Sequence, residues 1–232
     1  MRKLAISLFL MLMSTAAFAA KPSIGVSEFK NETSAGWWSS DVGEDLAGML
    51  TNELAGLEKF KVVERAKLGP VLDEQNLADS GRINKSTGAK IGKLTGAQYL
   101  VFATVTSFDT QSRGTGGGVS FRGISVGGKK EDAYIAVDLR VVDTTTGEIA
   151  YSRTVEARAG SYGVSGGIYR GGFGGNLSKY ENTPTGKAIR AVVMEISEYL
   201  GCVMVDQDGC ESDYAAKEKS RRDKTKKAIK LD

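Results

Sequence analysis

The 232-residue sequence contains no histidine. That absence removes the usual base of a serine hydrolase and the commonest zinc ligand. A Gly-x-Ser-x-Gly string at residues 163–167 therefore lacks the base that would activate Ser165. The acidic side chains form no cluster within one expected element. The sequence predicts no catalytic, cofactor-binding or metal-binding site, and no enzyme activity is expected.

Cysteine is scarce, and only seven residues separate the two that occur, Cys202 and Cys210. In an oxidising compartment a pair closing so short a loop is expected to form a disulfide. No cysteine lies in residues 1–30. A bacterial lipoprotein needs a cysteine as its first mature residue to carry the acyl chains, so the mature protein is not expected to be lipidated.

Residues 1–19 have the pattern of a cleavable signal peptide. Arg2 and Lys3 give a positive start, an apolar run follows at residues 4–13, and Ala17-Phe18-Ala19 precedes the expected cleavage before Ala20. The apolar run is too short for a stop-transfer helix. We therefore expect export to the periplasm or the outer membrane.

The charge is nearly balanced, with 31 Lys and Arg against 28 Asp and Glu. Removing residues 1–19 leaves 29 basic residues against 28 acidic, which gives no electrostatic basis for binding nucleic acid. The remaining basic excess lies in a C-terminal tail, residues 216–232. This tail is interpreted as a solvated helix end, with binding to anionic head groups or peptidoglycan as the alternative.

Residues 20–215 are predicted to form one α/β domain with a mixed sheet packed against helices. Strands are expected at residues 23–29, 60–64 and 99–108, and a hairpin at residues 135–143 and 148–156. Helices are expected at residues 41–57, 66–77, 87–94 and 184–200. Asp41 and Glu44 suit a capping box for the first helix, and Thr183 before Pro184 suits an N-cap for the last.

Two Gly-rich insertions, residues 109–134 and 157–183, interrupt this pattern. Structureless loops of such length are uncommon in a compact domain and are usually functional or disordered. Each insertion is also long enough for a β-hairpin of two membrane strands, which need roughly 9 to 11 residues apiece. The apolar membrane-hairpin candidates are Val119, Phe121, Ile124, Val126, Tyr162, Val164, Ile168, Tyr169 and Phe173. The first four keep one face only if a turn or bulge near Arg122 and Gly123 corrects their phase.

Several strings resemble the family of CsgG, the curli secretion channel, and of the related HfaB-type proteins. The most specific is Ile-Ala-Val-Asp-Leu-Arg-Val-Val-Asp at residues 135–143, followed by Thr-Gly-Glu-Ile at residues 146–149. Further matching strings lie at residues 63–65, 96–101, 161–164 and 169–170. The resemblance extends over nearly all of the mature chain.

The resemblance implies a periplasmic α/β domain that assembles into a ring, with each subunit lending two hairpins to one shared transmembrane β-barrel. It places a constriction in the loop at residues 33–39, where Thr33, Trp37 and Trp38 stand. Packing of the two tryptophans against the first helix or a neighbouring subunit is the alternative.

The function implied is that of a non-enzymatic, curli-channel-type export component for secretion or assembly of an extracellular polypeptide. Its expected partners are further copies of itself, the secreted polypeptide, cell-envelope accessory proteins and the outer membrane. The alternative is a soluble periplasmic adaptor that uses the same domain to bind a cell-envelope partner. No cofactor is expected.

Overall fold

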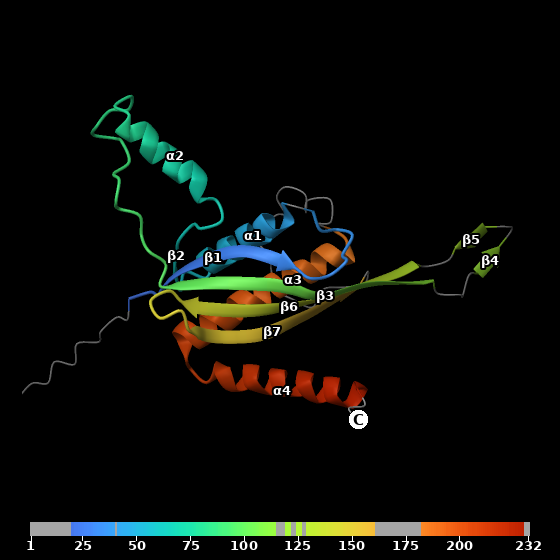
Figure 1. The fold of residues 1–232 in the computed structure, drawn as a ribbon. Coiled ribbons are helices and arrows are strands. Elements are labelled where there is room, and N and C mark those ends of the chain that lie inside the picture. Colours follow the sequence, from blue (N-terminus) through green and yellow to red (C-terminus); the bar gives the residue numbers. More distant parts are fainter. Residues whose placement is uncertain are drawn as a thin grey trace, which may run out of the picture.

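The computed structural model describes residues 20–39, 41–114, 119–121, 124–126, 129–160 and 182–229, and within residues 112–130 it describes the backbone alone. A five-stranded mixed sheet with the order β2-β1-β3-β6-β7 forms its centre (Figure 1). The strands are β1 (Ser23–Asn31), β2 (Lys61–Val62), β3 (Tyr99–Gly114), β6 (Lys129–Asp143) and β7 (Ile149–Gly160). β2 and β3 both pair parallel with β1, whereas β6 and β7 continue the sheet antiparallel. The predicted mixed α/β class is confirmed.

Two helices, α1 (Val42–Gly56) and α3 (Pro184–Gly201), cover one face of the sheet (Figure 1). Their apolar residues recur at helical spacing and are almost fully buried, for example Leu50 and Leu54 in α1 and Ile196 in α3. Alternate strand residues such as Val101 and Val141 meet them from the sheet. The core therefore lies between these helices and this face, while Asp138, Arg140 and Thr154 are among the polar residues of the opposite face.

The helix ends follow the predictions in part. Thr183 caps α3, because its hydroxyl accepts a hydrogen bond of 3.1 Å from the Gly186 amide. The capping box predicted for α1 is wrong: the Asp41 side chain makes no capping hydrogen bond, and its backbone carbonyl accepts instead from the Asp45 amide at 3.0 Å.

A second helix is confirmed as α2 (Leu68–Asp79), but the helix predicted at residues 87–94 is wrong. Turns and extended segments occupy residues 81–98 instead. Gly92 adopts a φ of 74°, and Ile91 and Leu94 are 57% and 46% exposed. Since a short helix depends on packing its apolar face, a glycine-interrupted segment without a surface to pack on does not stay helical.

The strands run beyond their predicted ends into the proposed insertions. β3 continues to Gly114 and pairs with β6 from Tyr99↔Asp143 as far as Gly114↔Lys129, while β7 extends to Gly160. A short pair, β4 (Val119–Phe121) and β5 (Ile124–Val126), forms a separate two-stranded sheet.

The C-terminal tail is part of a solvent-exposed helix. A π-helical segment, η2 (Cys202–Asp206), leads into α4 (Cys210–Ala228), which has no buried residue. Among the residues described, no helix combines the length and apolar character needed to cross a membrane.

Gly43 allows α1 to approach β1 closely. A Cβ added at this position would lie 2.4 Å from the Phe29 carbonyl oxygen, which is backbone and does not yield easily. We expect Gly43→Ala to lower the free energy of unfolding by about 1–3 kcal/mol, measured by urea denaturation. Gly48→Ala on the same helix meets open space and is the control, expected to stabilise by about 0.5–1 kcal/mol. Equal effects of the two substitutions would contradict this account.

Candidate functional site

A two-stranded ribbon leaves the domain where β3 and β6 extend beyond the core (Figure 1). Seven residue pairs, from Phe108↔Ile135 to Gly114↔Lys129, continue the ladder without a further register shift. β7 stays paired with β6 as far as Asp132↔Gly160, so among the described residues only the last three pairs, from Ser112↔Glu131 onward, are two-stranded. At about 3.4 Å per residue they extend roughly 10 Å past the last β6–β7 pair. The first predicted insertion thus begins as an extension of the central sheet.

The short pair β4 and β5 has a register that groups four of the predicted membrane-hairpin residues. Val119 pairs with Val126 and Phe121 pairs with Ile124, while Ser120 pairs with Ser125. Directly paired residues, and residues two apart along a strand, share one face. The four apolar positions therefore fall on one face of this pair and the two serine positions on the other.

The candidates of the second insertion are Tyr162, Val164, Ile168, Tyr169 and Phe173. All five lie outside the described residues, so their assignment to a membrane hairpin stays a prediction.

The loop after β1 carries the predicted constriction residues and lies at the root of the ribbon. Trp37 is only 5% exposed, and its ring meets the rings of Trp38 and Phe108 edge-on at centroid distances of 5.4 and 5.3 Å. The Trp37 Nε1 group is buried and finds no acceptor among the described residues. Trp37 is thus part of the core. Its contact with Phe108 stabilises the part of β3 that leads into the ribbon.

Hydrogen bonds hold this loop in one conformation. The Asn31 carboxamide oxygen accepts from both the amide and the hydroxyl of Thr33, at 2.9 and 2.7 Å, and the Thr33 hydroxyl accepts from the Ala35 amide at 3.2 Å. The Glu32 amide donates to the Val105 carbonyl at 2.9 Å. Local side-chain bonds of this kind favour a defined turn. The constriction role of Thr33, Trp37 and Trp38 stays a prediction, and the ring contacts of Trp37 are with Trp38 and with Phe108 of β3.

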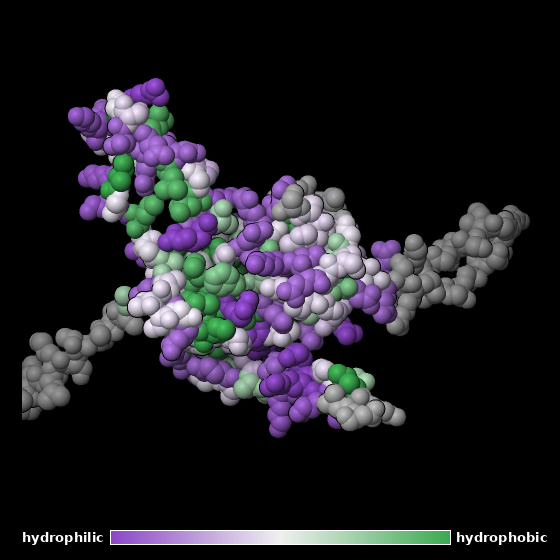
Figure 2. Space-filling model, viewed as in Figure 1, coloured by the Kyte–Doolittle hydropathy of each residue, from purple (hydrophilic) through white to green (hydrophobic). Residues whose placement is uncertain are grey.

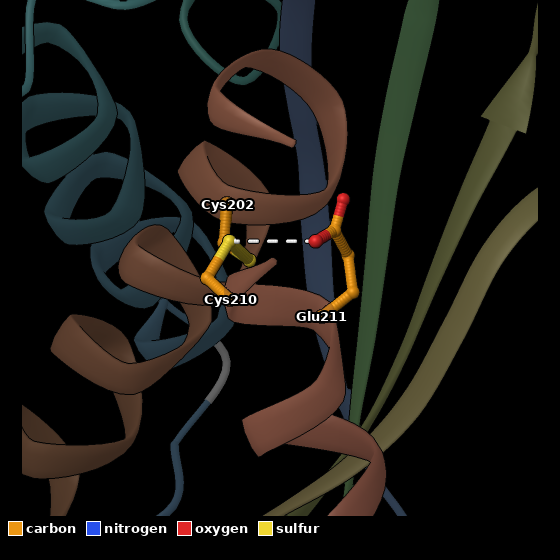
Figure 3. A group of neighbouring side chains, drawn as sticks. All are labelled: Cys202, Cys210 and Glu211. Atoms are coloured by element: carbon orange, nitrogen blue, oxygen red, sulfur yellow. Dashed lines mark hydrogen bonds between the residues drawn. A yellow bond between two sulfur atoms is a disulfide. The ribbon is translucent and has the colours of Figure 1, made fainter. Parts of the chain in front are cut away.

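The predicted disulfide is confirmed and ties the end of α3 to the start of α4. Cys202 and Cys210 are joined with their Cα atoms 6.0 Å apart (Figure 3). Glu211 Oε2 lies 3.9 Å from Cys210 Sγ. Because both sulfur atoms are consumed by the bond, neither is a thiolate that could bind a metal.

Contacts around the Arg153 side chain, called the Arg153 clamp below, hold α4 beside the sheet. The sequence did not predict them. The Arg153 guanidinium of β7 lies 5.1 Å from the Tyr199 ring centre and 4.7 Å from that of Tyr214, and it donates to the Tyr214 carbonyl oxygen at 3.3 Å. Its Nη2 is 3.7 Å from Glu195. The side chain is only 9% exposed. The signal available in the sequence was a charged residue at an inward position of an otherwise alternating strand, between Tyr151 and Val155.

Burial raises the pKa of the Tyr214 phenol to about 12, with Glu195 and Glu198 adding to the shift and Arg153 opposing it. The unfolded chain releases this proton near pH 10, so the contribution to stability is complete below pH 10 and is lost as the pH rises towards 12. We expect the tyrosinate absorbance titration to contain a phenol with a pKa near 12 that Tyr214→Phe removes. A wild-type titration that Tyr214→Phe changes only near pH 10 would contradict this.

A family model described as "Curli production assembly/transport component CsgG" matches residues 6–229. The protein of that description from Escherichia coli (strain K12) is 27% identical over 137 residues, which cover 57% of this chain and 50% of that protein. The chain thus spans about half the length of the curated curli relatives that it matches.

Two further similarities cover more of the chain. A Neisseria meningitidis serogroup B protein named as a lipoprotein is 30% identical over 187 residues, which cover 78% of this chain and 76% of that protein. Among solved structures, the protein CT253 from Chlamydia trachomatis superposes with a TM-score of 0.45 at 14% identity, covering 79% of this chain and 97% of that chain.

Proposed function

This chain belongs to the CsgG family, and from that premise we propose that it is a ring-forming, non-enzymatic export component of the bacterial cell envelope. Its work would be to secrete or assemble an extracellular polypeptide. The curated relatives are named for the assembly and transport of curli, and the signal-peptide pattern of residues 1–19 is consistent with a place in the periplasm or outer membrane. The disulfide favours an oxidising compartment of this kind.

The observation that carries the proposal is the β3–β6 ribbon together with the β4–β5 pair, whose apolar and serine positions lie on opposite faces. Strands β3 and β6 remain paired for three residue pairs past the end of β7, as far as Gly114↔Lys129, and the β4–β5 register groups apolar positions against serine positions. A strand pair between lipid and water needs this division into an apolar and a polar face. We propose that residues 109–134 and 157–183 supply the two membrane hairpins of each subunit.

The α2 arm supports self-assembly. This helix stands away from the body of the molecule, and apolar side chains show on its surface (Figures 1 and 2). Val71, Leu72 and Leu77 are 38%, 41% and 40% exposed. Exposed apolar groups gathered on one projecting element mark protein–protein contact surfaces. A neighbouring copy in a ring would cover them.

Electron microscopy of detergent-solubilised membranes tests the proposal. We expect ring-shaped particles from the wild-type chain, and we expect Leu72→Asp to abolish them because a charge would be buried at the contact. The matched control is Glu74→Gln, which lies about 200° around the same helix and should leave the rings intact. A monomer found only in the soluble periplasmic fraction would refute the proposal.

A soluble adaptor is the second candidate function. The inward packing of Trp37 favours it, because a buried ring cannot line a passage. The exposed basic residues of α4 also favour it, since they offer a surface to an anionic envelope partner. This candidate predicts a monomer that binds an envelope partner and loses that binding when α4 is changed.

A further inference from the structure

A groove runs along β7, the outer strand of the described central sheet. β7 is the last strand in the order and pairs only with β6 among the described strands. Between β7 and α4 lies a hollow of about 720 Å³ lined by Arg153, Thr154, Val155, Glu156 and Arg158 of the strand. Because consecutive residues of β7 point to opposite faces of the sheet and all of these line the hollow, the hollow lies along the backbone edge of β7. Half of the N–H and C=O groups of an edge strand point away from its only neighbour.

The far wall of the groove is α4, which runs alongside β7. Tyr214 meets Arg153 at one point, and Arg221 meets Glu156 at 3.8 Å further along. The three-residue step from Arg153 to Glu156 along β7 rises about 10 Å, and the seven-residue step from Tyr214 to Arg221 along α4 rises about 10.5 Å. The strand and the helix therefore run side by side over this distance. Ala216, Ser220, Thr225 and Ala228 are small residues that line this wall. A strand and a helix thus form the sides of an extended channel.

The helix is attached by side chains and stands off from the strand. Its anchors are the Arg153 clamp, a 3.0 Å ion pair between Lys217 and Glu195, and the longer pair between Arg221 and Glu156. No residue of α4 is buried. Ion pairs as exposed as those of Lys217 and Arg221 contribute little to stability, so the part of α4 beyond Arg221 can move without disturbing the core.

The charges of the groove leave one end positive. Glu195 pairs with Arg153 and Lys217, and Glu218 pairs with Arg221. Two of the three acidic residues that line the groove are in these pairs, and the third, Glu156, lies 3.8 Å from Arg221. Arg158 and Lys224 lie towards the other end, are exposed, and form no ion pair with a described residue; Arg158 rests on the Tyr134 ring at 4.8 Å. This end is suited to receive a carboxylate.

We propose that the groove between β7 and α4 binds an extended polypeptide segment of a partner, which adds to the sheet as a strand beside β7. The backbone of the segment pairs with the outer edge of β7, which is a common way for proteins to bind peptides. Its acidic side chain lies opposite Arg158, where Lys224 also reaches it, because directly paired residues share one face of a sheet. This site goes beyond the proposed export role and does not depend on ring formation.

The test uses the mature full-length chain and a fluorescent, acetylated octapeptide in which valine and threonine alternate between two terminal aspartates. Binding is measured by polarisation. Two control peptides carry N-methyl groups on odd or on even residues. Only alternate N–H groups of an added strand face β7, so one methylated peptide should bind at least about tenfold more weakly and the other normally. Equal binding of both, or no binding of the parent peptide, would overturn the proposal.

Charge variants test the positive end. Lys224→Glu should weaken binding about fivefold to tenfold, and replacing the peptide aspartates by asparagine should remove that dependence. Lys219→Glu makes the same change on α4 at a residue that does not line the groove, and should leave binding unchanged. If the chain instead dimerises in light scattering and the peptide dissociates the dimer, the groove serves a second copy and the partner assignment is wrong.

Discussion

Replacing Trp37 with alanine is expected to lower the free energy of unfolding by about 3–5 kcal/mol, as for other large buried aromatic residues. The ring is 5% exposed and lies edge-on to Phe108 and Trp38 at the root of the ribbon. Its removal leaves a cavity where the loop after β1 meets β3. Urea denaturation followed by circular dichroism measures the loss.

Trp38→Ala is the matched control, because Trp38 is half-buried and adjoins the same cluster. Losing its edge-on contact should cost about 0.5–1.5 kcal/mol together with a smaller loss of buried area. If Trp37→Ala kept full stability and changed only the passage of a secreted polypeptide, Trp37 would be a constriction residue and its packing role would be refuted.

Reducing the disulfide is expected to free α4 while the core stays folded. The bond closes a short loop between Cys202, which is 3% exposed, and Cys210. A cross-link over such a loop contributes about 2–3 kcal/mol in the chain-entropy account. Amide hydrogen exchange in α4 should therefore become roughly 30- to 150-fold faster, with the amides of α1 and the sheet unchanged.

The control for this experiment is the Cys202→Ala/Cys210→Ala variant. Its α4 should exchange rapidly in both oxidising and reducing buffer, so that any response to reductant in the wild type is assigned to this one bond. Faster exchange throughout the domain would show that the disulfide supports the whole fold, contrary to the expectation. Unchanged exchange in α4 would show that the Arg153 clamp alone holds the helix.

Local patterns predicted the elements that pack on the core. The apolar residues of α1 and α3 recur at helical spacing, and those of β6 and β7 alternate, because these segments bury a single face. Thr183 was recognisable as a cap because its hydroxyl bonds to an amide only three residues away. The pairing of Cys202 with Cys210 followed from their number and short separation.

The helix prediction was wrong where a segment with helical spacing does not pack against the rest of the domain. Residues 87–94 have helix-compatible spacing, yet they are exposed and interrupted by Gly88 and Gly92. The extension of β3 to Gly114 was missed because its polar residues show no alternation, and its pairing with β6 alone sustains it. The clamp at Arg153 joins three separate elements, so no short window of sequence contains it.

The sequence by itself determined the family, the α/β class, the short disulfide and the two Gly-rich insertions, because each depends on residue type and spacing along the chain. The tertiary structure decided which way Trp37 packs, how far the ribbon extends and where α4 lies. These depend on contacts between distant segments: Phe108 with Trp37, β3 with β6, and Arg153 with Tyr199 and Tyr214. The groove along β7 exists only through such contacts, since its two walls are separate elements that the fold brings side by side.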